Sequence, residues 1–148
     1  MLFLSAGNIH RAFGAKTTDQ VQGAIRRVPF SGTMFLLGFL AITGSPPFGP
    51  FISEFTILNA IFGAGRFFVG GLFLLLLLII FIGMGRTVLT VVQGRPPIAS
   101  RRTTYRDTLL TSLQILIAFA LVLMMGTYIP RPLATMLHDA AEFLEVRP

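Results

Sequence analysis

The chain has 148 residues, of which 53% are hydrophobic and 12% are charged, and its mean hydropathy is +0.77. A soluble domain normally carries about a quarter charged residues, so a soluble enzyme is excluded. Three uncharged stretches, residues 28–53, 67–85 and 108–130, approach or exceed the roughly 20 residues that cross the hydrocarbon core of a bilayer. The sequence therefore predicts an all-α membrane protein.

Charge and cysteine content narrow the functions further. The sequence has 12 basic and 6 acidic residues, but Lys and Arg in the loops of a membrane protein set its topology, so we expect no nucleic-acid partner. There is no cysteine, and the only two histidines, His10 and His138, lie far apart. We therefore expect no thiolate cluster, no paired-histidine metal site, no redox centre and no cofactor in this chain.

Residues 1–27 are expected to form a partial helix followed by an interfacial linker. An apolar run, residues 1–6, stops at a Gly-Asn pair and resembles the tail of a helix whose start is missing. The residues that follow are polar and basic. Thr17 and Gln20 have the spacing of a capping box, which predicts a short linker helix that ends at Arg27.

Residues 28–62 are expected to form a helix, a break and a second, shorter helix. The break consists of Gly44, Ser45, Pro46, Pro47, Phe48, Gly49 and Pro50. A continuous helix is not expected to pass through so many glycines and prolines. The dozen residues that follow, 51–62, would measure about 18 Å as a helix, which is short of the roughly 30 Å hydrocarbon core. The alternative is that the string forms a turn at the membrane surface.

Two complete transmembrane helices are expected after the break, at residues 67–92 and 108–129. The loop between them contains two prolines and four arginines, which are Pro96, Pro97, Arg95, Arg101, Arg102 and Arg106. Pro130 and Pro132 are expected to end the second helix.

Residues 133–146 are expected to form an amphipathic tail helix, because apolar side chains recur there at helical spacing. The opposite face carries Asp139, Glu142 and Glu145. Anionic lipid headgroups would repel an acidic face, so we expect this helix to pack on a protein partner.

The arginines alone do not orient the chain. Residues 8–27 and 93–107 are both basic, yet they lie on opposite sides of the membrane if the segments before and after the break each cross it. Either one of these regions departs from the rule that cytoplasmic loops are positive, or the segment after the break re-enters the same side.

Glu54 is the only acidic residue inside the apolar body of the chain, and it lies shortly after Pro50. Desolvation favours the protonated form of a carboxyl group, which suits a group that takes up and releases protons. The alternative is a cap on backbone N–H groups near the helix start, where the helix dipole favours a negative group. The combination of break, short helix and acid favours the proton relay, since transporters build ion sites from irregular backbone beside ionisable groups.

Arg86 and His10 are possible supporting residues. Arg86 lies near the end of its helix, so its long side chain can reach the membrane surface; alternatively it faces a neighbouring subunit or pairs with a carboxylate. His10 lies at the membrane edge, where a histidine is usually solvated, and the alternative is that it belongs to a proton path.

Two strings carry a family resemblance: residues 2–8, LFLSAGN, and residues 44–55, GSPPFGPFISEF. They resemble the C-terminal part of the proton-translocating, antiporter-like subunits of complex I and its relatives. The loop residues 95–97 and the string 125–132, MGTYIPRP, are most similar to the hydrogenase-4 component F branch. The resemblance covers nearly all of the chain.

The resemblance implies the C-terminal fragment of an antiporter-like helix bundle, with one broken helix, two to three further transmembrane helices and an amphipathic C-terminal helix. In such bundles a row of charged residues passes protons along the membrane midplane, and Glu54 matches the ionisable residue of the second broken helix. The upstream broken helix, glutamate and lysines of the family have no counterpart in this sequence.

The implied function is the C-terminal section of a proton-translocating subunit in a hydrogenase-4-like or NADH-quinone-oxidoreductase-like complex. Such a protein would be multi-pass in the cell inner (plasma) membrane, with other membrane subunits and the lipid bilayer as its partners, and those subunits would carry the electrons. One alternative is a non-conducting structural module, a truncated or split subunit that packs against its partners. Another is a small independent transporter built by oligomerisation.

Overall fold

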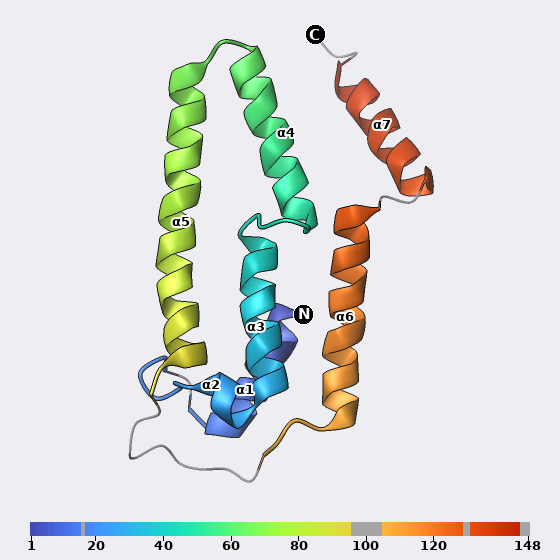
Figure 1. Cartoon of the computed structure of the whole chain (residues 1–148). Helices are drawn as coiled ribbons and strands as arrows, with labels where there is room; N and C mark the ends of the chain where they lie inside the picture. The colour runs from blue at the N-terminus through green and yellow to red at the C-terminus, as the bar shows by residue number, and fades with distance from the viewer. Residues whose placement is uncertain (16, 96–104, 129–130, 146–148) are drawn as a thin grey trace.

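The computed structural model describes residues 1–15, 17–95, 105–128 and 131–145. Within these ranges the chain forms seven helices and no strand, which confirms the all-α fold (Figure 1). The helices are α1 (Leu2–Phe13), α2 (Ala24–Arg27), α3 (Pro29–Ile42), α4 (Gly49–Gly63), α5 (Phe67–Gln93), α6 (Leu109–Thr127) and α7 (Arg131–Glu145).

The helices α3 and α4 are the two halves of one broken helix. They have 14 and 15 residues and lie end to end beside α5, which has 27 residues, so that the break falls part way along α5 (Figure 1). Among the described residues, α5 and α6 are each long and apolar enough to cross a membrane, whereas α3 is a shorter apolar helix.

This stacking resolves the conflict between the two basic regions. The linker before α3 lies at the same end of the molecule as the C-terminus of α5 and the N-terminus of α6 (Figure 1). Arg26, Arg27, Arg95 and Arg106 flank these helix ends and therefore share one side. The conflict came from counting the halves of the broken helix as two crossings; because the halves lie end to end, both basic regions lie at one end of the molecule.

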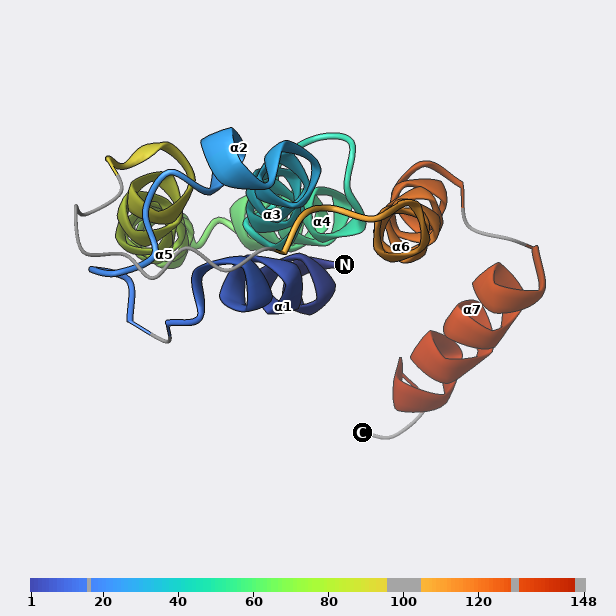
Figure 2. The ribbon, with the colours of Figure 1, turned by 90° about the horizontal axis from the view of Figure 1, so that it is seen from below.

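The packed core lies at this basic end. Seen along the helix axes, α3 is central and is surrounded by α1, α2, α5 and α6 (Figure 2). Two clusters of buried side chains lie here, and Phe35 of α3 packs against both. They consist of Ile9, Ala12, Phe13, Val21, Ala24, Val28 and Val91, and of Phe39, Val88 and Val92. In contrast, α4 contacts α5 and α6 but has no buried residue, so much of its surface is left to contact lipid or other protein.

The N-terminal region differs from the sequence-based expectation. Helix α1 continues through the Gly-Asn pair as far as Phe13, because Ile9, Ala12 and Phe13 are buried against the core and offset the weak helix propensity of that pair. The Arg27 guanidinium lies 4.9 Å from the centre of the Phe13 ring, a cation–π contact that helps to hold the linker on α1.

The linker helix is much shorter than expected. The N–H groups of Gln20 and Val21 both donate to the carbonyl of Thr17, which makes a single turn there rather than a capped helix. Helix α2 comprises only Ala24–Arg27 and follows Gly23, whose φ of 75° interrupts any earlier helix.

The helices after the break lie close to their expected positions, since α5 and α6 begin and end within two residues of the predicted bounds. Pro132 lies inside α7 rather than ending α6, and Pro96, Pro97, Arg101, Arg102 and Pro130 lie outside the described residues. Helix α7 stands beyond α6, away from the core (Figures 1 and 2). Its Met136, Leu137 and Phe143 side chains are all more than half exposed.

Candidate functional site

The helix break is closed by glycine and proline geometry. After α3, Gly44 adopts φ 70°, and the Ser45 N–H donates to the Leu40 carbonyl at 3.1 Å, as in a Schellman motif. Two further members of the predicted break, Pro46 and Pro47, also lie between the helices and are joined by a cis peptide bond. Phe48 is the N-cap of α4, and the last two members of the break, Gly49 and Pro50, open that helix.

Glu54 lies in α4 and turns its carboxylate back onto the break. A Cβ atom on Gly44 would overlap Oε2 of Glu54, so the carboxylate occupies the space beside the glycine. The residue is half-buried. In the described part of the chain, no hydrogen bond or ion pair reaches this carboxylate, including any from the backbone N–H groups that a cap would use. The carboxylate therefore lies against the break without a hydrogen-bond or ion-pair partner among the described residues.

Helix α6 covers the other side of the break. A Cβ atom on Gly126 would lie 2.5 Å from the Pro47 carbonyl oxygen and 2.7 Å from the Gly49 nitrogen. The Phe48 side chain is buried, and its ring meets the ring of Phe119 edge to face at 6.1 Å. Irregular backbone at membrane depth needs such a protein cover. Sequence reasoning did not identify Gly126 as part of the site; its only signal is a glycine near the end of an otherwise apolar helix.

The two predicted supporting residues, His10 and Arg86, do not contribute to the Glu54 site. His10 lies in the last turn of α1 and is exposed. Arg86 is exposed on α5, beside Gly85, which is buried next to Phe39. Among the described residues, neither side chain makes an ion pair with Glu54. The site that the structure assembles consists of Glu54, the break and the end of α6.

A second polar cluster, at the start of α3, gave no signal in the sequence. Asp107 Oδ2 accepts hydrogen bonds from the N–H groups of Phe30 and Ser31 at 3.1 and 3.2 Å. The Ser31 hydroxyl donates to Asp107 Oδ1 at 2.5 Å and accepts from Asn8 Nδ2 at 3.1 Å. The Tyr105 hydroxyl donates to Asn8 Oδ1 at 3.0 Å. We call these four side chains, Asn8, Ser31, Tyr105 and Asp107, the α3 anchor.

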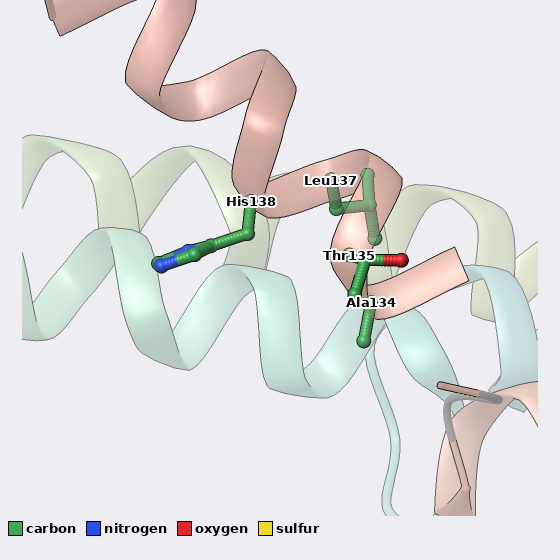
Figure 3. Close-up of a pocket in the computed structure, with 4 residues that line it drawn as sticks. All are labelled: Ala134, Thr135, Leu137 and His138. Atoms are coloured by element: carbon green, nitrogen blue, oxygen red, sulfur yellow. The ribbon is translucent and has the colours of Figure 1, made fainter. Parts of the chain in front are cut away.

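A hollow lies on the surface of α7. It is lined by Ala134, Thr135, Leu137 and His138, which all come from this one helix, and the His138 side chain projects away from the helix axis (Figure 3). Among the described residues, no group of three His, Cys, Asp or Glu side chains could hold a metal ion. The hollow therefore offers no cluster of ligands.

Comparison with known proteins adds information about the first part of the chain. The sequence profile for NADH:quinone oxidoreductase/Mrp antiporter transmembrane regions matches residues 1–84, a range that includes the break and Glu54. The chain is similar to a Na(+)/H(+) antiporter subunit of Bacillus subtilis, with 32% identity over 74 residues. It is also similar to a subunit of the F(420)H(2) dehydrogenase of Methanosarcina mazei, with 32% identity over 62 residues.

These alignments cover 50% and 42% of the chain but only 15% and 12% of the two relatives. The chain therefore matches a small part of the length of each relative.

Proposed function

The chain belongs to the NADH:quinone oxidoreductase/Mrp antiporter transmembrane family, and from this we propose that it is a membrane subunit of a complex-I-like, proton-translocating assembly. The observation that carries the proposal is the Glu54 carboxylate, which lies against Gly44 at the break between α3 and α4 and has no partner among the described residues. We assign electron transfer to partner subunits and proton movement to this part of the assembly.

In the proposed mechanism, Glu54 alternates between a neutral and a charged carboxyl group. The charged carboxylate takes up a proton on one side of the step and becomes the neutral carboxyl group. Backbone groups freed at the break and water admitted there can stabilise the charged form when the proton leaves. The absence of an ion pair in the described residues suits this cycle, because a fixed cation would hold the carboxylate in its charged form.

We further propose that the parent complex is of the hydrogenase-4 type. The support is the similarity of residues 95–97 and 125–132 to that branch of the family. The homologous proteins named above belong to an antiporter and to a dehydrogenase, each as one of its subunits, so partner membrane subunits are part of the proposal. We place the protein in the plasma membrane, with three crossings made by the α3–α4 pair, α5 and α6.

The decisive experiment is Glu54→Gln in the assembled complex. Glutamine keeps the size of the side chain but cannot exchange a proton, so transport driven by electron transfer should fall by about a hundredfold, within the range of a lost acid–base group. Transport is measured in inverted membrane vesicles with a pH-sensitive dye and, in parallel, a sodium-sensitive dye, which identifies the ion that moves.

Asp19→Asn is the control, since Asp19 is an exposed acid in the linker between α1 and α2, and it should leave transport unchanged. A Glu54→Gln complex that assembles and pumps at the normal rate would contradict the proposal. It would favour a structural module that packs against partners through exposed helices such as α4 and α7.

The proposed topology makes a separate prediction. The positive-inside rule places the basic end in the cytoplasm, so Arg95→Cys should react with a membrane-impermeant thiol reagent only from the cytoplasmic side. Arg66→Cys, in the turn between α4 and α5, should react only from the opposite side. The sequence contains no cysteine, so each introduced thiol is the only one in the chain. Labelling of both positions from one side would contradict the topology.

A further inference from the structure

The start of α3 is capped by a residue that is distant in the sequence. Val28 occupies the N-cap position and has no side-chain oxygen, and Pro29 follows it in the first turn. Proline has no N–H, so the first unpaired donors are the N–H groups of Phe30 and Ser31. Asp107, more than seventy positions away, accepts both of them. Its negative charge also suits the positive end of the helix dipole.

The rest of the α3 anchor extends this cap to α1. Ser31 and Asn8 are 0% and 7% exposed. Ser31 is hydrogen-bonded to Asp107 and to Asn8, and Asn8 is hydrogen-bonded to Ser31 and to Tyr105. A buried polar network that is fully paired is rigid, and one that loses a member leaves costly unpaired groups. The segment before α6, the start of α3 and α1 therefore hold one another in fixed positions.

Helix α3 connects this anchor to the Glu54 site. Its 14 residues form a stiff rod of about 21 Å, with Asp107 at one end and Gly44 just beyond the other. Its glycines bring it close to its neighbours: a Cβ on Gly38 would lie 2.8 Å from the Leu2 side chain. A displacement at the start of α3 is thus passed along the rod to the glycine that receives the Glu54 carboxylate.

We infer that Asp107 is a positioning residue for proton transfer at Glu54, acting through α3. This inference rests on the proposed function of Glu54. Asp107 holds the first half of the broken helix in the position at which Gly44 meets the carboxylate. The segment that precedes α6 is therefore part of the transport machinery, although it lies at the opposite end of α3 from the break.

The test compares Asp107→Ala and Asp107→Asn with the control Asp19→Asn in the native complex. Asp19 is an exposed acid in the linker between α1 and α2. Two quantities are measured: transport per assembled complex, and the infrared carboxyl absorption of Glu54, assigned by difference from Glu54→Gln. The second quantity reports the surroundings of the carboxyl group itself.

Asp107→Ala should lower transport per assembled complex by about tenfold, because it removes a charged cap of a helix start, and should shift the Glu54 absorption. Asp107→Asn keeps an oxygen that can accept from the backbone N–H groups, so it should give a smaller change in the same direction. Asp19→Asn should change neither quantity. If Asp107→Ala does not assemble, Asp107→Asn decides the question.

A purely structural cap would reduce the amount of assembled complex and leave transport per complex and the Glu54 absorption unchanged. That result, in a protein whose Glu54→Gln variant has lost transport, would overturn the role of Asp107 and leave the proposed function standing. Normal transport in Glu54→Gln would instead overturn the proposed function, and the role of Asp107 with it.

Discussion

Gly126→Val is expected to push the helix break away from α6 and to destabilise the protein by about 3 kcal/mol, at the upper end for overpacked sites. The first added carbon would lie 2.5 Å from the Pro47 carbonyl oxygen and 2.9 Å from the Phe48 carbonyl carbon. Both atoms belong to the backbone, so no side-chain rotation can make room. The two segments must separate, which exposes the irregular backbone that α6 covers.

The measurement is thermal or denaturant unfolding of the protein purified from its native membrane, together with the yield of assembled complex. Gly83→Ala is the control, since it also adds a side chain to a helical glycine but meets no atom within 4 Å. Alanine has the higher helix propensity, by about 1 kcal/mol, so this control should be neutral or stabilising. Equal stability of the two variants would show that α6 does not pack on the break.

Gly44→Ala is expected to be the most damaging alanine substitution within the break. Its φ of 70° lies in the left-handed region, which costs a residue with a side chain roughly 1 to 2 kcal/mol. The new methyl group would also overlap the Glu54 carboxylate. The two effects together should destabilise the protein by about 3 kcal/mol and should displace the carboxylate, so transport should fall as well.

Gly65→Ala separates the two effects. Gly65 has φ 71° but no neighbour within 4 Å of an added Cβ, so alanine there should destabilise the protein only by the backbone contribution of roughly 1 to 2 kcal/mol.

The clash between an alanine at position 44 and the Glu54 carboxylate is tested by a double-mutant cycle. Gly44→Ala should cost much less in a Glu54→Ala background than in a Glu54→Gln background, because only glutamine keeps the overlapping atoms. Additive effects in the alanine background would contradict the contact between Gly44 and Glu54.

The break and the apolar helices could be predicted because their signals are local. A string of glycine and proline interrupts a helix wherever it occurs, and long uncharged stretches report their own length. Glu54 was identifiable in the same way, as a single acid in an apolar region. The structure adds that its carboxylate is folded back onto Gly44, a detail that depends on the path of the chain through the break.

The contacts that hold the site had no such signal. Gly126 and the break, or Asp107 and Ser31, are brought together only by packing of helices that are distant in the sequence. The extent of α1 shows the opposite error, since a Gly-Asn pair disfavours an isolated helix but the burial of Ile9 and Phe13 outweighs it. In α1, tertiary packing overrides local helix propensity. At the site, tertiary packing supplies the contacts of Gly126 and Asp107.

The unequal burial of α3 and α4 gives the two halves of the broken helix different sources of order. Amide hydrogens in α3 are protected by four neighbouring helices of the same chain, whereas α4 buries none of its residues within the described part of the chain. Local opening should therefore require much less free energy in α4 than in α3. The position of α4, which carries Glu54, therefore depends on the lipid or protein around it. The position of α3, which leads into Gly44, is set by packing within the chain.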